Sequence, residues 1–167
     1  MQQEYRQKGF SLIELLIVVA IIGIIAAIAI PNLLASKRAA NEGSAQSSLR
    51  SVHSSELSFK ATAGAGQYGT IADLKTAGFL DSVLGGDGTS TTTTKSGYNF
   101  EANPVAITAL PQFYATAVPA QTGNLSRTGH RSFTIDDFGV LRGKVSDTGP
   151  ADYNEATDNT AWPPVNN

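Results

Sequence analysis

Glu14 is the residue whose chemistry most needs a partner, because it is the single charged side chain in the apolar run from Phe10 to Ile30. A run of this length matches the roughly 20 residues that an α-helix needs to cross a bilayer core of about 30 Å. Ionisable side chains inside membrane helices are costly, at about 2.5–3.5 kcal/mol for an Asp at the helix centre, and they usually have a function. The position of Glu14 therefore predicts a carboxylate that binds a cationic group.

A cut of the chain after Gly9 would supply that cationic group. It would leave Phe10 with a free α-amino group, whose ordinary pKa of about 7.7–8.0 makes it largely cationic at neutral pH. Within one helix, Phe10 and Glu14 are four residues apart and lie on one face, and between staggered chains Glu14 could also meet the Phe10 of a neighbour. The alternative is a Glu14 that only extends toward the lipid headgroups.

Other residues capable of chemistry show no catalytic arrangement. His53 and His130 are the only histidines, and neither is spaced as a metal ligand would be. Asp136 and Asp137 are adjacent, so in a strand their side chains would point to opposite faces, and a hairpin turn explains them better. There is no cysteine, and therefore no disulfide or thiol ligand. The net charge of −2 gives no general attraction to nucleic acid, so nucleic acid stays uncertain as a partner. We expect no enzymatic activity, no cofactor and no metal.

The residues around Glu14 resemble a known processing signature. A polar leader that ends in Gly9, followed by Phe10 and an apolar helix with Glu14 at its fifth residue, resembles the class III signal peptide of type IV pilins, in particular type IVa major pilins. The resemblance implies that a membrane-embedded prepilin peptidase cuts after Gly9 and N-methylates Phe10. It also implies that Glu14 pairs with the Phe10 amine of a neighbouring subunit, and that Gly23 and Pro31 loosen the helix.

The elements that position these residues follow from hydrophobic periodicity and turn residues. After the cleaved leader, residues 1–9, we expect one helix with a transmembrane half, residues 10–31, and an amphipathic half, residues 32–62. One stripe of the second half recurs at spacings of four and three: Ala45, Leu49, Val52, Glu56 and Phe59. This pattern predicts that the second half lies on a globular domain.

The remainder of the chain predicts an antiparallel sheet. Residues 63–97 are expected to be a variable connecting loop that contains a short helix capped by Thr70, and residues 98–145 to be four strands. Residues 146–167 are expected to be a C-terminal loop anchored by Trp162. The predicted fold class is α+β: the pilin fold, with a long N-terminal helix packed on a four-stranded antiparallel sheet. Many type IV pilins close the C-terminal loop with a disulfide, which this chain cannot do.

The expected function is that of a structural subunit of an extracellular type IV pilus, stored in the bacterial inner membrane before assembly. The resemblance implies as partners other copies of the chain, the prepilin peptidase, an assembly ATPase, a platform and an outer-membrane channel. Adhesion, twitching motility and DNA uptake all remain open. One alternative is a pseudopilin of a type II secretion system, although acids at 147, 152, 155 and 158 lack the calcium-loop pattern of its major member. Another is a membrane-anchored surface domain that never polymerises.

Overall fold

The computed structural model describes residues 9–86, 88–105, 110–123 and 126–165. Most of the expected leader, residues 1–8, therefore lies outside the described residues. Two compact units are present, of which one ends at Ser36 and the other begins at Lys37. Helix α1, Leu12–Ala61, contributes residues to both units.

Helix α1 has nearly the bounds that the sequence predicts. Its first turn is closed by the Leu15 amide, which donates to the Ser11 carbonyl at 3.2 Å. Beyond Ala61 the chain turns away, where the Gly64 amide donates to the Phe59 carbonyl at 2.7 Å and Gly66 adopts a φ of 88°. A left-handed glycine after the last turn is a common way to end a helix.

The connection after α1 contains helix α2, Ile71–Thr76. Thr70 caps it as predicted, and Asp73 completes a capping box, since each side chain accepts a hydrogen bond from the other residue's backbone amide. Ile71 and Leu74 of α2 are fully buried. The cap and these two apolar side chains fix the short helix against the domain.

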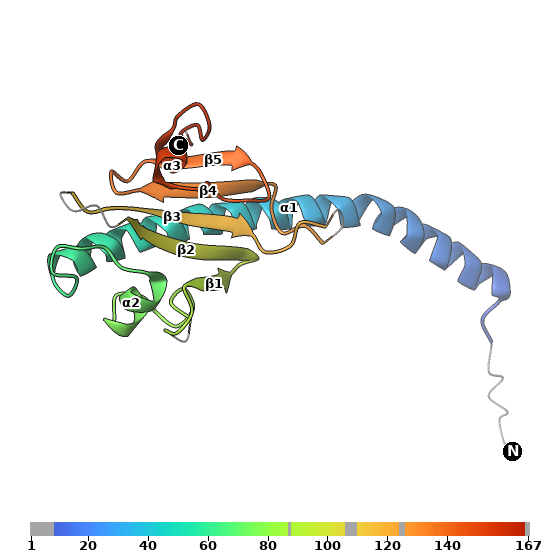
Figure 1. The fold of residues 1–167 in the computed structure, drawn as a ribbon. Coiled ribbons are helices and arrows are strands. Elements are labelled where there is room, and N and C mark those ends of the chain that lie inside the picture. The colour runs from blue at the N-terminus through green and yellow to red at the C-terminus, as the bar shows by residue number, and fades with distance from the viewer. Residues whose placement is uncertain (1–8, 87, 106–109, 124–125, 166–167) are drawn as a thin grey trace, which may run out of the picture. The chain divides into compact units, whose positions relative to one another are not determined.

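The sheet has five strands, all antiparallel and in sequential order (Figure 1): β1 Thr92–Lys95, β2 Tyr98–Val105, β3 Gln112–Pro119, β4 Arg131–Asp136 and β5 Leu141–Val145. The prediction of four strands missed β1, which lies in the expected connecting loop. Ser96 and Gly97, both with positive φ, form a two-residue turn that pairs Lys95 with Tyr98. The threonines of this segment are β-branched and suit an edge strand, whereas their polarity had suggested a loop.

One face of the sheet packs against the second half of α1. The core includes Ala45, Leu49 and Val52 of the predicted helix stripe, all fully buried, together with sheet residues Phe100, Phe113, Phe133 and Ile135. Gly143 is needed opposite Phe133, because a Cβ at this glycine would lie 2.8 Å from the phenyl ring. The stripe prediction is thus confirmed for the residues that hold the sheet on α1.

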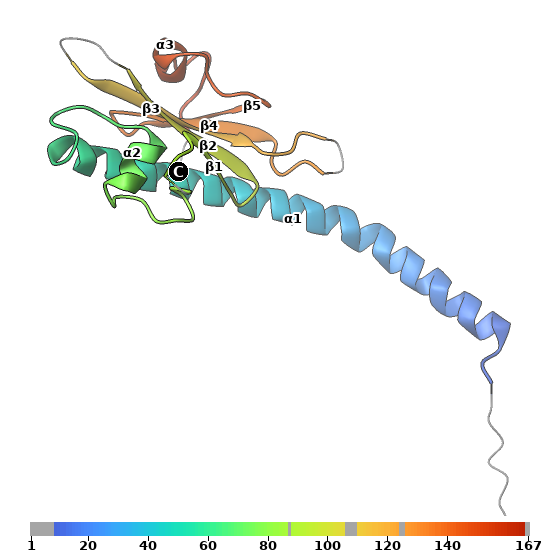
Figure 2. The ribbon, with the colours of Figure 1, turned by 60° about the horizontal axis from the view of Figure 1, so that its bottom comes forward.

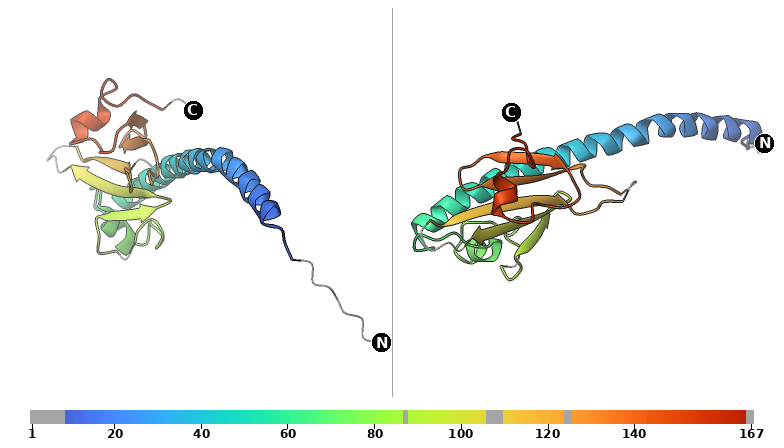
Figure 3. Two further views of the ribbon diagram at one scale, coloured as in Figure 1. Left: turned by 90° about the vertical axis from the view of Figure 1, so that its right-hand side faces the viewer. Right: turned by 45° about the horizontal axis from the view of Figure 1, so that its top comes forward.

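The opposite face of the sheet carries the C-terminal segment with helix α3, Tyr153–Thr157, which the sequence did not predict. Figures 2 and 3 show α3 on the far side of the sheet from the second half of α1. Trp162 is 1% exposed and donates from its Nε1 to Glu155, so the predicted anchoring role of this tryptophan is confirmed. The tail also pairs with the sheet through a bridge between Arg142 and Pro164.

Candidate functional site: the N-terminal processing and assembly segment

Gly9 and Phe10 form an accessible, non-helical segment immediately before α1. Phe10 is 84% exposed, and a Cβ built on Gly9 would meet no atom within 4 Å. The fold of this chain therefore places no steric demand for glycine at residue 9. Any such demand comes from a protein that recognises the segment.

Glu14 lies in the first turn of α1, as an exposed side chain. A carboxylate there is favoured by the partial positive charge of the helix N-terminus. Among the residues that the structure describes, none forms a hydrogen bond or an ion pair with its carboxylate. Because Phe10 precedes the helix, the predicted pair of Phe10 and Glu14 on one helix face is not formed in the uncut chain. A cationic partner for Glu14 would have to come from cleavage or from another molecule.

Around Glu14, α1 exposes apolar side chains on all sides. The large apolar residues from Leu12 to Leu33 have exposed fractions between 47% and 81%. By length and composition, α1 could cross a membrane, and no other helix in the described part of the chain could. A helix that is apolar all round is stable inside lipid or inside other protein, and not in water. This surface therefore needs an apolar covering, such as lipid or other protein.

The two expected helix-loosening residues, Gly23 and Pro31, lie within an unbroken α1. A Cβ at Gly23 would meet no atom within 4 Å, so the fold does not require glycine there. Pro31 has no amide to donate to the preceding turn. The carbonyl that this amide would have bonded is that of Ala27, whereas the Asn32 side chain donates to the Ile28 carbonyl, at 3.0 Å. Loosening of the helix in an assembled state remains a prediction.

The histidines and the paired aspartates have structural partners. His53 stacks on Phe113, with ring centroids 5.9 Å apart, and its Nε2 lies 3.3 Å from the Asp137 carbonyl. Asp136 and Asp137 have different partners, since Asp136 accepts a hydrogen bond from Arg142 and Asp137 accepts one from the Tyr153 hydroxyl. The turn interpretation of this pair is confirmed: Gly139 has a φ of 78° and its amide donates to the Asp136 carbonyl.

A buried carboxyl group on α1 was not recognised from the sequence. Glu56 is fully buried, accepts one hydrogen bond from the Gly69 amide at 3.0 Å, and leaves Oε1 without a partner among the described residues. Burial raises the pKa of Glu56 to about 7, the Gly69 amide opposes this, and the charge of Asp73 adds to it. The available signal was an acid within an otherwise apolar helix stripe.

The sequence of the N-terminal segment is similar to that of known proteins. The family described as "Prokaryotic N-terminal methylation motif" matches residues 5–30. The chain is 48% identical over 54 residues to the "Type IV major pilin protein PilA" of Myxococcus xanthus, a match that covers 32% of this chain and 24% of that protein. It is 69% identical over 35 residues to the "Type IV wide pilus major component PilA4" of Thermus thermophilus, a match that covers 21% of this chain and 27% of that protein.

The chain is also similar to a protein of a type II secretion system. The "Type II secretion system core protein G" of Pectobacterium carotovorum subsp. carotovorum is 40% identical over 53 residues, covering 32% of this chain and 34% of that protein. The chain thus matches about a quarter to a third of the length of these curated relatives. No solved structure gives a significant match.

The fold and the N-terminal segment together define a class of protein: a pilin-like chain with an N-terminal methylation motif, a long N-terminal helix and an antiparallel sheet. Within that class, the relatives named as major pilins support a type IV pilin with a class III signal peptide. Gly9, Phe10 and Glu14 lie within the residues that the motif matches.

Proposed function

We propose that this protein is the structural subunit of an extracellular type IV pilus. The precursor is held in the inner membrane by α1, is cut after Gly9 by a prepilin peptidase that methylates Phe10, and is then added to a helical homopolymer. An assembly ATPase, a platform and an outer-membrane channel complete the set of partners. The protein acts by packing and not by catalysis.

The observation that carries this proposal is the exposed apolar surface of α1, most of which lies within the residues that the methylation motif matches. Residues 12–33 need an apolar covering, and both lipid and a bundle of identical helices can provide one. Lipid is about as apolar as a neighbouring helix, so transfer from lipid to a filament core gains little from hydrophobicity alone. An ionic contact between Glu14 and a neighbour's Phe10 amine would supply the specificity that the apolar surface lacks.

The second candidate is a pseudopilin of a type II secretion system, which the similarity to core protein G favours. The acids of the C-terminal segment argue for the pilin, because each has its own local role. Asp152 caps α3, Asp158 accepts from the Thr160 amide, and Asp147 pairs with Arg127 at 2.7 Å. Among the described residues, no three His, Cys, Asp or Glu side chains are grouped as ligands of a metal ion.

A deletion of the gene in the native bacterium separates the candidates. We expect the deletion strain to lose surface fibres and to keep its normal secretion of proteins into the medium, with fibres restored by the wild-type gene. Loss of secretion with fibres intact would instead identify a pseudopilin. If immunogold labelling finds the protein on the surface of cells that have never made fibres, it is an anchored domain that does not polymerise.

A further inference from the structure

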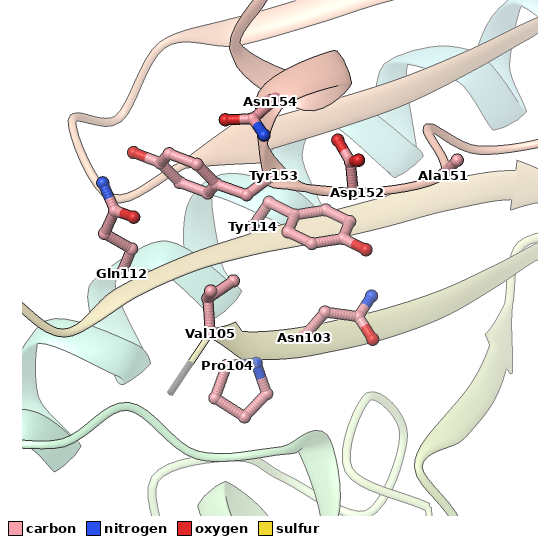
Figure 4. Close-up of a pocket in the computed structure, with 9 residues that line it drawn as sticks. All are labelled: Asn103, Pro104, Val105, Gln112, Tyr114, Ala151, Asp152, Tyr153 and Asn154. Atoms are coloured by element: carbon pink, nitrogen blue, oxygen red, sulfur yellow. The ribbon is translucent and has the colours of Figure 1, made fainter. Parts of the chain in front are cut away.

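A groove crosses the sheet face opposite the second half of α1, where the C-terminal segment stops short of β2 and β3. Its volume is about 480 Å³, within the roughly 300–1,000 Å³ that is usual for small-molecule sites. The end of β2, the start of β3 and residues 151–154 form its walls (Figure 4). The groove lies wholly within the unit that begins at Lys37.

The two asparagine side chains in the groove differ from the other asparagines that the structure describes, because they are unpaired. The other asparagines that the structure describes each use the side chain in a hydrogen bond: Asn32, Asn41, Asn99 and Asn159. The two groove asparagines, Asn103 and Asn154, have no such bond within the described part of the chain, and neither does Gln112. Three amides, each able to donate and accept, thus line one groove without a partner among the described residues.

Two tyrosine rings accompany these amides. Tyr114 lies directly across from Asn103 in the register of β2 and β3. The Tyr153 ring is held in place because its hydroxyl donates to Asp137. In Figure 4 the Tyr114 ring extends toward the side of Asn103, and the Tyr153 ring extends the opposite way, toward the side of Gln112. The combination offers apolar ring faces together with hydrogen-bonding groups.

The charge around the groove disfavours an anionic ligand. The described residues that line it include Asp152 and no Lys or Arg. Burial raises the pKa of Tyr114, and the carboxylates of Glu101, Asp152 and Glu155 raise it further. Two of these carboxylates already bind donors of this chain, since Asp152 accepts from the Glu155 amide and Glu155 accepts from the Ala151 amide and Trp162. The groups left free for a ligand are therefore the neutral amides, the Tyr114 hydroxyl and Oδ2 of Asp152, which accepts no hydrogen bond among the described residues.

We propose that this groove binds a neutral saccharide. A pyranose ring has an apolar face of C–H groups and an edge of hydroxyls, and the groove presents partners for both. Tyr114 stacks on the apolar face, while Asn103, Gln112 and Asn154 exchange hydrogen bonds with the hydroxyls. The proposal does not depend on polymerisation, because every residue involved belongs to one globular unit.

The test is binding by the full chain, purified unassembled in lauryldimethylamine oxide, a detergent without a sugar headgroup. Saturation-transfer difference NMR is recorded with lactose, maltotriose, chitotriose and N-acetylglucosamine as neutral probes, sialyllactose as an acidic probe and glucosamine as a cationic one. We expect at least one neutral probe to bind with a Kd of about 1 mM. Tyr114→Ala and Asn103→Ala should each weaken that binding by about tenfold.

Gln112→Ala and Gln121→Ala form a matched pair, because both remove an amide and only Gln112 lines the groove. We expect Gln112→Ala to weaken binding and Gln121→Ala to leave it unchanged, with near-ultraviolet circular dichroism showing that each variant is folded. The proposal is overturned if no neutral probe binds, if the groove variants bind as the wild type does, or if glucosamine or sialyllactose binds more tightly than the neutral probes.

Discussion

Glu14 has an exposed carboxylate, no partner among the described residues of its own chain, and a place within the segment that the methylation motif matches. The proposed role of Glu14 is one ionic contact, with the Phe10 amine of a neighbouring molecule. The uncut precursor lacks the α-amino group that the contact needs, which ties assembly to processing. In the proposed function, Gly9, Phe10 and Glu14 would act in sequence, first as a cleavage site and then as an intermolecular pair.

Replacing Glu14 by glutamine tests the ionic contact. Glu14→Gln keeps the size of the side chain and removes its charge, so we expect normal cleavage and at least a roughly tenfold fall in surface fibres, equivalent to about 1.4 kcal/mol. Fibres sheared from cells are measured by immunoblot against the total processed protein. Glu14→Asp, which keeps the charge, is the control and should retain more fibres. Equal fibre yields from Glu14→Gln and the wild type would contradict the proposed role.

Replacing Gly9 tests whether the peptidase, and not the fold of the chain, requires a glycine at this position. A Cβ at Gly9 or at Gly43 meets no atom of this chain, so neither Gly9→Val nor Gly43→Ala should disturb the globular unit. We expect Gly9→Val to keep its leader, as seen in the intact mass of the membrane protein, whereas Gly43→Ala is cut normally. A cut Gly9→Val protein would show that another feature directs the peptidase.

The buried Glu56 predicts a pH dependence of stability. Its pKa is raised from 4.5 to about 7 in the folded chain, so the folded state holds the proton more tightly than the unfolded state does. The resulting stabilisation is complete below about pH 4.5, is lost as the pH rises toward 7, and amounts to roughly 3 kcal/mol. Chemical unfolding of the full chain in detergent at about pH 5 and about pH 8 measures this loss. Glu56→Gln should be less sensitive to pH over this window, and an unchanged pH dependence would contradict the assignment.

The C-terminal segment is held on the sheet without a disulfide, because the chain has no cysteine. Asp136 and Arg142 form a buried ion pair with side chains 1% and 7% exposed, and Arg142 also donates to Asn159. Two backbone hydrogen bonds also hold the C-terminal segment on the sheet. The Gly143 amide donates to the Pro163 carbonyl, and the Val165 amide donates to the Leu141 carbonyl. Polar contacts and the burial of Trp162 thus hold the loop that a disulfide closes in many type IV pilins.

Arg142→Met should destabilise the domain, because it leaves the buried Asp136 carboxylate without its cation. We expect a loss of about 3 kcal/mol in the free energy of unfolding, measured by denaturant titration followed through Trp162 fluorescence. Arg127→Ala is the matched control, since it breaks the more exposed pair with Asp147 and should cost less than about 1 kcal/mol. If both variants lose a similar free energy of unfolding, burial of the ion pair of Asp136 with Arg142 contributes little to stability.

At the element scale, the sequence predicted what depends on local pattern. The bounds of α1, the Thr70 cap, the Gly139 turn and the helix stripe follow from apolar spacing and turn residues. Strand β1 was missed because a run of threonines is polar, and only its pairing with β2 through the Ser96–Gly97 turn makes it a strand. Helix α3 was missed although Asp152 is a local N-cap signal, and the ion pair of Asp136 with Arg142, six residues apart, forms only when β4 pairs with β5.

At the scale of the whole molecule, two surfaces have different requirements. The apolar surface of residues 12–33 needs lipid or other copies of the chain, whereas the globular unit has its own core and an open groove. In a filament built on the helices, polymerisation would bury the first surface and could leave the second available to ligands. The candidate site residues were predictable because the signal is local in sequence, whereas the groove arises only when β2, β3 and the C-terminal segment meet.

The intact mass of the subunit in fibres sheared from the cell surface tests the central claim most directly. We expect a single species that begins at Phe10 and carries one added methyl group. That result would establish cleavage after Gly9, methylation and export as a polymer in one experiment. A subunit that retains residues 1–9, or sheared fibres that lack this protein while membranes contain it, would contradict the account.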